Sequence, residues 1–378
     1  MSAMKKTLLF SLLLMLIGCD DAKENPAIWN GKADTKWYNK NEIEFTITTP
    51  EQLAGLAKLV EGGNDFYGKT IKLGADIMLN DTADWQNWDK KAPRNEWKPI
   101  GTYIDEINGR IPDFLMDHTG SILVDAFVPE FIRRALRLTD TDLPFKGIFD
   151  GGSFVVSGVY INTLESYQGL FGYIKSYYKK TELRNLGIRA SYIKGGASVG
   201  SLVGKSEGVV SGCYSTALVV GAGAGGLVGY NDYSINAIIT NSYFTGTISG
   251  NSTIGGLAGV NYGAISDSYS TGAVVGNIMV GGLVGYNYGT INGSYSAGAV
   301  SGNNNVGGFV GESEGEIINS YYNMETSKSD IGKGEPRTTE ELKLLFTFAG
   351  WDFANLWGID STANGGYPYL RNMLRKSE

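Results

Sequence analysis

Residues 254–269 read IGGLAGVNYGAISDSY, and residues 280–295 read VGGLVGYNYGTINGSY. Both stretches open with a form of Gly-Gly-Leu-Val-Gly and close on Ser-Tyr. Copies of the apolar motif end at Gly204, Gly229, Gly259, Gly285 and Gly311. The tyrosines after the last four copies are Tyr243, Tyr269, Tyr295 and Tyr321, which recur every 26 residues. A fixed period of this length predicts a solenoid, in which each repeat stacks on its neighbour.

The interior of one repeat predicts which solenoid forms. Two residues before each tyrosine lies Gly, Asn or Asp, as at Gly212, Asn241 and Asp267. These residue types tolerate the left-handed backbone conformation, so we interpret the position as a corner between short strands. A β-branched residue such as Ile248 or Val274 usually lies five after the tyrosine. We predict three strands of about five residues per turn, and an all-β, single-stranded parallel β-helix with short capping helices and one helical insertion.

Charge is nearly absent from the repeats. Between residues 208 and 311 the only acids are Asp232 and Asp267, and there is no Lys, Arg or His. In a parallel stack, identical positions lie one strand spacing apart, so repeated like charges would repel one another. Uncharged Asn and Tyr stack without that cost, and rows of them add stability. We expect inner rows of Leu, Val and Ile, together with ladders of Tyr and Asn.

The repeats also carry a family resemblance. Gly-Gly-Leu-Val-Gly is similar to the GLUG motif of bacterial surface proteins, and four flanking segments resemble the same proteins, at residues 29–35, 47–57, 145–152 and 366–370. The resemblance implies a β-helix and a bacterial surface lipoprotein. It implies little about activity, because GLUG repeats accompany adhesins and also flank unrelated enzyme domains.

Residues 1–18 have the features of a secretory signal peptide. Lys5 and Lys6 precede an apolar run of about ten residues, which is too short to span a membrane. The run ends in Leu-Ile-Gly-Cys at residues 16–19, which resembles the bacterial lipobox. We expect lipidation of Cys19 and a tether over residues 19–26. The anchor predicts a membrane-bound protein. The acidic residues after Cys19 resemble an inner-membrane retention signal of enteric bacteria, and also a surface-export signal of gut bacteria from other phyla. The GLUG-like repeats favour the second, so we expect an outer-membrane protein exposed at the cell surface.

The rest of the chain divides into four predicted parts. Residues 27–102 form an N-terminal cap and first turns, 103–144 an insertion, 145–323 the β-helix with GLUG repeats, and 324–378 a C-terminal cap. In the first part, Thr-Pro-Glu-Gln at 49–52 has the pattern of a helix start, and Gly62-Gly63 ends that helix. The tryptophans gather toward both ends of the chain. We expect them, and the aromatic segment 351–369, to close the ends of the core.

Composition excludes some classes of function. The net charge is −7, and loss of Lys5 and Lys6 makes it two units more negative. This balance, without a basic stripe, argues against nucleic acid as a partner. With Cys19 assigned to the lipid, Cys213 has no partner within the chain and is interpreted as a small packed residue. We expect a monomer without a cofactor.

Patterns typical of catalysis are weak. Gly-x-Ser-x-Gly occurs at 196–200, 204–208 and 311–315, but the helix that a nucleophile elbow requires is not expected after these serines. His118 has Asp113, Asp117 and Asp125 nearby, which are metal-binding types, although a solvated loop is the simpler interpretation. The main enzyme alternative is a polysaccharide lyase or hydrolase, for which the candidate carboxylates are Glu312, Glu314, Glu316 and Asp150. We predict no catalytic residue and no metal site.

Strand alternation indicates a binding face instead. After Leu257 and its equivalents, every second residue points outward, which places Tyr230, Val260 and Tyr286 in one row and Tyr262 and Tyr288 in the next. Rows of aromatic faces flanked by amides and hydroxyls suit a sugar chain. We therefore predict a non-catalytic adhesion module for a polysaccharide or host glycan, with candidate ligand-binding residues Tyr230, Tyr262, Tyr286 and Tyr288. A surface spacer whose tyrosines only stack on one another is the alternative.

Overall fold

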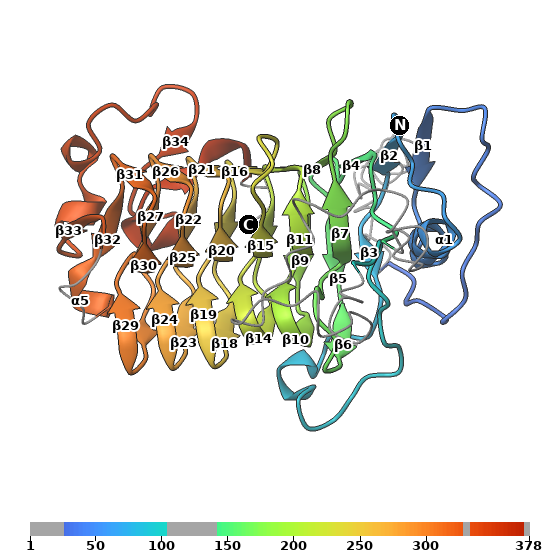
Figure 1. Cartoon of the computed structure of the whole chain (residues 1–378), viewed down its shortest axis with the longest axis horizontal. Coiled ribbons are helices and arrows are strands. Elements are labelled where there is room, and N and C mark those ends of the chain that lie inside the picture. Colours follow the sequence, from blue (N-terminus) through green and yellow to red (C-terminus); the bar gives the residue numbers. More distant parts are fainter. Residues whose placement is uncertain (1–25, 104–141, 328–332, 374–378) are drawn as a thin grey trace, which may run out of the picture.

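The computed structural model describes residues 26–103, 142–327 and 333–373, which form a long solenoid of parallel strands (Figure 1). Four parallel sheets run along its length, and we name each for a residue that marks it. The predicted all-β parallel β-helix is confirmed.

The isoleucine sheet and the tyrosine sheet each stack nine strands in a single row. The isoleucine sheet contains β1 (Glu44–Ile47), β2 (Thr70–Leu73), β4 (Ile148–Asp150), β8 (Glu182–Arg184), β12 (Val209–Ser211), β16 (Ile238–Thr240), β21 (Ala264–Ser266), β26 (Thr290–Asn292) and β31 (Glu316–Ile318). The tyrosine sheet contains β3 (Ile77–Met78), β5 (Val155–Ser157), β9 (Gly187–Arg189), β13 (Tyr214–Ser215), β17 (Tyr243–Phe244), β22 (Tyr269–Ser270), β27 (Tyr295–Ser296), β32 (Tyr321–Asn323) and β33 (Glu335–Arg337).

The other two sheets complete each turn. The asparagine sheet contains β7 (Phe171–Lys175), β11 (Val203–Glu207), β15 (Val228–Asn231), β20 (Ala258–Asn261), β25 (Val284–Asn287) and β30 (Val310–Ser313). The valine sheet contains β6 (Tyr160–Asn162), β10 (Tyr192–Gly200), β14 (Leu218–Gly225), β18 (Thr247–Ser249), β19 (Ser252–Gly255), β23 (Ala273–Val275), β24 (Ile278–Gly281), β28 (Val300–Ser301) and β29 (Asn304–Gly307).

The predicted division of one turn is wrong. From Ala258 to Gly281 the chain makes five strands, β20 to β24, of two to four residues each, instead of three longer ones. The predicted corner is present, since Asn241 and Asp267 have φ of 48° and 46°. A second left-handed corner lies at Thr253 and Met279, with φ of 58° and 52°. Thr and Met rarely adopt this conformation, so the sequence did not mark the extra bend.

The register between turns follows the repeat. Tyr243 lies opposite Tyr269, which in turn lies opposite Tyr295. The second glycine of the motif is required by this close stacking. A Cβ at Gly256 would lie 2.0 Å from the carbonyl oxygen of Gly282, and a Cβ at Gly282 would lie 2.2 Å from that of Gly308. These distances are far below van der Waals contact, so only glycine fits.

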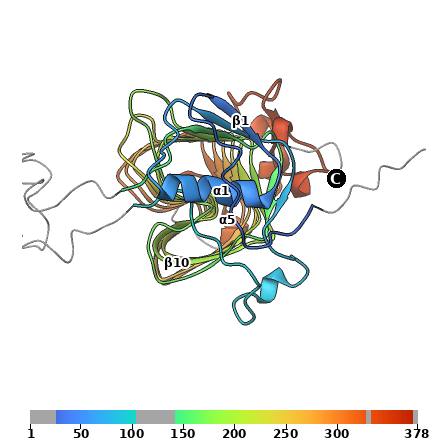
Figure 2. The ribbon, with the colours of Figure 1, turned by 90° about the vertical axis from the view of Figure 1, so that its right-hand side faces the viewer.

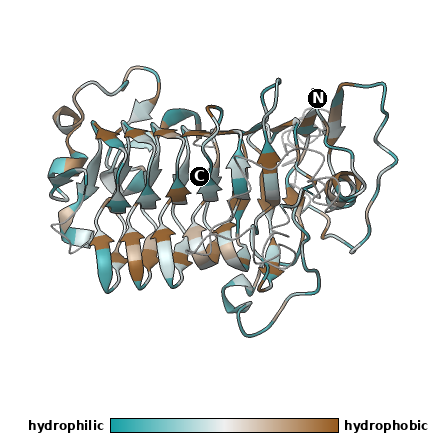
Figure 3. Ribbon diagram, viewed as in Figure 1, coloured by the Kyte–Doolittle hydropathy of each residue, from teal (hydrophilic) through white to brown (hydrophobic). Residues whose placement is uncertain are grey.

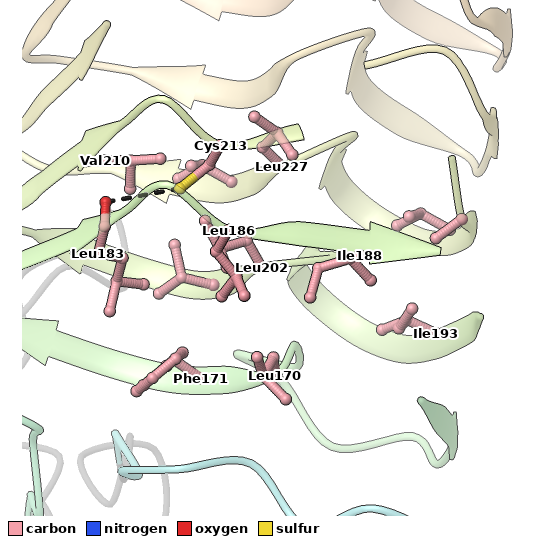
Figure 4. Close-up of a cluster of buried hydrophobic side chains, with 14 of the residues drawn as sticks. Leu170, Phe171, Leu183, Leu186, Ile188, Ile193, Leu202, Val210, Cys213 and Leu227 are labelled. Carbon is pink, nitrogen blue, oxygen red and sulfur yellow. Dashed lines mark hydrogen bonds between the residues drawn. The ribbon is translucent and has the colours of Figure 1, made fainter. Parts of the chain in front are cut away.

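One continuous hydrophobic core fills the solenoid from α1 to the last turn. Apolar core residues align from turn to turn, as Ile239, Ile265 and Ile291 do. Figure 3 shows hydrophobic positions along the whole length of the solenoid. Cys213 lies in this core among Leu183, Leu186 and Leu202 (Figure 4), with its Sγ 3.6 Å from the Leu183 carbonyl oxygen. The thiol is fully buried, and burial raises its pKa to about 12. Its interpretation as a small packed residue is confirmed.

Buried polar ladders run beside the apolar rows. The Asn231, Asn261 and Asn287 side chains are fully buried and hydrogen-bonded from turn to turn. In a second ladder, the backbone N–H of Ser242 donates to the hydroxyl of Ser268 at 3.2 Å, and this bond repeats on later turns. These ladders satisfy polar groups that the interior would otherwise leave unpaired. The expected Asn and Tyr ladders are confirmed.

Helix α1 (Pro50–Glu61) lies across the N-terminal end of the solenoid (Figure 2). Thr49 and Gln52 form the predicted capping box, and Gly62 ends the helix. Its apolar face enters the core through Leu53 and Leu56. The helix therefore covers strand edges that would otherwise be open to association.

The predicted role of the C-terminal segment is wrong. After α5 (Met324–Ser327) and β33, the chain packs against Tyr269, Tyr295 and Tyr321 of the tyrosine sheet instead of closing the end. Figure 2 shows this segment (red) outside the solenoid. Trp357 is fully buried there, with its ring 6.1 Å from Tyr269 and 6.2 Å from Tyr295. This segment, the C-terminal cover (residues 338–373), contains η3 (Glu341–Lys343), η4 (Leu345–Thr347), η5 (Asn364–Gly366), η6 (Arg371–Met373) and the antiparallel pair β34 (Trp357–Gly358) and β35 (Tyr369–Leu370).

The tryptophans at the N-terminal side follow the prediction only in part. Trp37 and Trp97 pack against the core near α1. Trp85 and Trp88, at the short helix η1 (Trp85–Asn87), lie instead in a separate cluster on the outside of the valine sheet. The ends of the insertion meet in an antiparallel bridge between Thr102 and Leu143. Its predicted helix and His118 lie outside the described residues.

Candidate binding face

The outer side of the asparagine sheet presents one row of residues from turn to turn. Its strand register aligns Tyr173, Lys205, Tyr230, Val260, Tyr286 and Glu312. The neighbouring residues of the same strands are the buried asparagines, because successive side chains of a strand point to opposite faces. The expected outward placement of Tyr230 and Tyr286 is therefore what the structure has.

The predicted tyrosines form one connected group of rings. The ring centroids of Tyr230 and Tyr262 are 5.5 Å apart, those of Tyr262 and Tyr288 are 4.3 Å apart, and those of Tyr286 and Tyr288 are 4.3 Å apart. The planes of Tyr262 and Tyr288 differ by only 4°, so their faces lie against each other. This is the stacking that the spacer alternative expects, and it covers the faces that these two rings turn toward each other. What they present outward is ring edges and hydroxyl groups.

Two more residues extend this group: Tyr233, which sequence reasoning missed, and Glu314, which it named only as a candidate catalytic carboxylate. Tyr233, in the loop after β15, has its ring centroid 3.7 Å from that of Tyr262 and is 70% exposed. Glu314, which follows β30, accepts a 2.6 Å hydrogen bond from the Tyr286 hydroxyl. Hydrogen bonding to Glu314 raises the pKa of Tyr286, and burial raises that of Tyr262, so both hydroxyls remain protonated at neutral pH. Tyr233 lies outside the repeat pattern, which is why alternation did not mark it.

At its N-terminal side the row ends in a charged cluster. The Lys205 ammonium lies 3.0 Å from Asp232, 3.7 Å from Glu207 and 4.0 Å from the centre of the Tyr103 ring. The Tyr173 hydroxyl donates to Glu207. Burial alone would lower the pKa of Lys205, but the charge of Asp232 and other neighbours more than offsets this effect, and the pKa is raised. The cluster thus holds a charged lysine, paired with two carboxylates, at one end of the tyrosine row.

This cluster also brings two carboxylates of neighbouring turns together. Contact with the same ammonium keeps Glu207 and Asp232 within about 7 Å of each other, the range of paired acids in glycoside hydrolases. Both are ion-paired and only 18% and 16% exposed. The Lys205 ammonium lies between them, where a glycoside hydrolase holds the glycosidic bond. The arrangement therefore fits a structural ion cluster better than a catalytic pair.

The carboxylates named from the sequence lie elsewhere. Asp150 accepts a 2.9 Å hydrogen bond from Arg184 and others from Asn185 and the backbone of Gly152. Although burial opposes it, these bonds hold the pKa of Asp150 below its usual range. Glu312, Glu314 and Glu316 line the last turn, where Glu312 pairs with Lys333 at 3.2 Å.

The serines of the Gly-x-Ser-x-Gly matches are built into the fold. Ser206 and Ser313 are buried members of the row that holds the asparagine ladder. Ser313 accepts a hydrogen bond from Asn287, and Ser206 donates to the Gly208 carbonyl. Ser198 lies at a left-handed corner, with φ of 55°. Strands and corners surround all three, so the strand-to-helix turn of a nucleophile elbow is not formed.

Some predicted residues lie outside the described part of the chain. Cys19 and the signal segment belong to these, as do His118 and the three aspartates near it. Within residues 26–103, 142–327 and 333–373, no three His, Cys, Asp or Glu side chains come together as a metal site. The helices of the same ranges are all too short or too polar to cross a bilayer.

Comparison with known proteins agrees with this class of fold. The family model described as the GLUG motif matches residues 220–249. A solved structure described as "a putative immunoglobulin A1 protease from Bacteroides ovatus" superposes with a TM-score of 0.55 over 88% of this chain and 93% of that chain, at 19% sequence identity. At this identity the likeness shows the fold alone. No curated protein matches the chain.

Proposed function

We propose that this chain is a lipid-anchored bacterial surface protein that binds glycans without catalysing a reaction. The observation that carries the proposal is the connected tyrosine group on the outside of the asparagine sheet, from Tyr230 to Tyr288. Its outer rim is a row of hydroxyls and apolar ring edges, ended by the carboxylate of Glu314. Such a rim matches the hydroxyls and C–H groups of a sugar chain.

The shape of this face sets the strength of binding. It is a shallow row rather than a pocket, so a single site should bind only in the range of about millimolar. Many copies anchored to one membrane would act together and give useful adhesion. Tyr233, with an exposed ring beside Tyr262, adds an apolar surface at one end of the row.

Two sets of substitutions test the face. Tyr262→Phe, Tyr286→Phe and Tyr288→Phe together keep the stack and remove its hydroxyls, and the corresponding Ala variant removes the rings. Retention on insoluble polysaccharide or host glycan should fall several-fold for the Phe variant and vanish for the Ala variant. The matched control is Thr290→Ala with Asn292→Ala, on the exposed side of the isoleucine sheet. Unchanged retention by a folded Ala variant would show that this face is not the site.

The anchor and the location are a separate part of the proposal. The lipobox-like segment ending at Cys19 supports lipidation, and with it an outer-membrane protein exposed at the surface. In Cys19→Ser, labelling with a fatty-acid analogue should be lost and the protein should leave the membrane fraction. Label that persists on this variant contradicts the anchor. The acidic last turn supports a monomer, because carboxylates on edge strands oppose end-to-end pairing.

A polysaccharide lyase or hydrolase remains the second candidate. It is favoured by one observation, the approach of Glu207 and Asp232 around Lys205. If the pair is catalytic, Glu207→Gln abolishes the release of soluble sugars from the retained polysaccharide and leaves retention intact. We expect the parent chain to release none.

A further inference from the structure

A cavity of about 460 Å³ lies beside the first turns, away from the tyrosine face. It is formed between the strand-like N-terminal segment at Trp29 and the loop over residues 80–95, which protrudes near β6 (Figure 1, cyan). The volume is that of a small-ligand pocket. Its lining combines two indole side chains, Trp29 and Trp88, with charged side chains of both signs.

The base of this loop is held firmly. Asn80 is 2% exposed, and its amide donates to the carbonyls of Asn95 at 2.8 Å and Gly158 at 2.9 Å. Asn95 donates in turn to the carbonyls of Trp29 at 2.8 Å and Leu79 at 3.0 Å. Trp88 is 3% exposed and meets Tyr160 edge to face. Loop, strand and valine sheet are therefore locked together, so the cavity is formed before a ligand arrives.

The charged side chains of the lining differ in whether they already have a hydrogen-bond or ion-pair partner. One carboxylate oxygen of Asp81 and one of Asp84 accept hydrogen bonds from within the loop, at Ala83 and Asn87. By contrast, the Lys91 ammonium and the Arg94 guanidinium have neither an ion pair nor a hydrogen bond to any residue that the structure describes. Two cations without an ion-pair partner, beside the partly exposed indole of Trp29, are a set that accepts an anion attached to an apolar ring face.

We propose that this cavity binds an acidic sugar residue, one whose ring carries a carboxylate or a sulfate. The C–H face of the sugar packs on Trp29, and its anionic group lies between Lys91 and Arg94. The free oxygens of Asp81 and Asp84 accept hydrogen bonds from its hydroxyls. This site does not depend on the tyrosine face, and each can fail without the other.

An array of uronate-bearing glycans, sulfated glycans and their neutral parents, probed with the purified full-length chain, tests the site. We expect binding to at least one acidic class and much weaker binding to its neutral parent. Lys91→Gln with Arg94→Gln should reduce that binding by about tenfold or more. Binding to uronate-bearing glycans would identify the anion as a carboxylate, and binding to sulfated glycans would identify it as a sulfate.

The matched control is Lys90→Gln with Lys98→Gln, which removes the same charge from exposed lysines that do not line the cavity. It should keep its binding within about twofold. The three Tyr→Phe substitutions of the tyrosine face should also leave acidic-glycan binding unchanged. Equal binding to neutral parents, no binding to any acidic glycan, or an equal loss in the control variant would each overturn the proposal.

Discussion

The side-chain amide of Asn261 donates to the side-chain oxygen of Asn287 at 2.7 Å, across one turn of the solenoid, and both side chains are fully buried. Asn231 continues the ladder by donating to Asn261 at 2.8 Å. The inner side of the asparagine sheet thus carries a row of side-chain amides, one on each of these turns, in place of apolar side chains. Its members depend on one another, because each supplies the partner of the next.

Asn261→Ala should destabilise the solenoid by about 2–4 kcal/mol, since it leaves a buried donor and a buried acceptor without partners. Chemical denaturation gives the free energy of unfolding. Asn277→Ala is the matched control, because Asn277 belongs to an exposed ladder with Asn251 and Asn303. We expect less than about 1 kcal/mol there. An equal decrease in the free energy of unfolding for both variants would mean that the buried amide ladder stabilises the fold no more than the exposed one does.

Deletion of residues 270–295 removes one 26-residue period and should leave a folded, shorter solenoid. The deletion joins Tyr269 to Ser296, and Ser296 already lies opposite Ser270 in the register. Deletion of residues 270–282 alone shifts every later strand out of register and should unfold the chain. Circular dichroism and thermal melting distinguish the two, and equal damage from both deletions contradicts the periodic register.

Trp357→Ala should release the C-terminal cover, because Trp357 is the largest buried side chain between that segment and the tyrosine ladder. Loss of such a buried indole costs about 3–5 kcal/mol. Hydrogen exchange should rise over residues 338–373 while strands β12 to β22 stay protected. Phe346→Ala, at a side chain that is 78% exposed, is the control and should change nothing. Loss of protection throughout the solenoid would show that cover and solenoid unfold together.

Asp267 and Asp150 should respond to pH in opposite directions. Burial raises the pKa of Asp267, so its native state holds the proton more tightly than the unfolded state does. The contribution of Asp267 to stability is therefore largest at low pH. It falls as the pH rises through the pKa that Asp267 has in the unfolded protein and then through the pKa that it has in the folded protein. Asp267→Asn should stabilise the protein at pH 7 by up to about 1 kcal/mol and have little effect near pH 3.

The pKa of Asp150 is lowered, so its contribution is present at neutral pH and is lost as the pH falls through the folded pKa. Asp150→Asn should accordingly destabilise by about 1 kcal/mol at pH 7. Melting temperatures of both variants at pH 3 and pH 7 are the measurement. If both variants change the melting temperature in the same direction at pH 7, the prediction is wrong.

The candidate site was predictable only in part. Alternation around Leu257 and Leu283 placed Tyr230, Tyr262, Tyr286 and Tyr288 on the outside, and these rings do meet. Their orientation was not predictable, because it depends on the rotation of each ring against its neighbour on the next turn. The charged cluster was missed for a different reason. Lys205 and Asp232 lie on neighbouring turns but break the uncharged pattern of the repeats, and Tyr103 comes from a segment far away in the sequence.

The sequence by itself determined the main repeating features, which are the 26-residue register, the corner at Asn241 and Asp267, and the Asn and Tyr ladders. Outside the repeats it determined the capping of α1 at Thr49. In a solenoid each residue contacts its equivalent one turn away, so a local pattern is also a tertiary contact. The C-terminal cover and the cavity beside Trp29 were decided only by the tertiary structure. Both arise where a segment without a repeat docks on the finished solenoid. Such docking is chosen by shape and long-range contacts that no period in the sequence encodes.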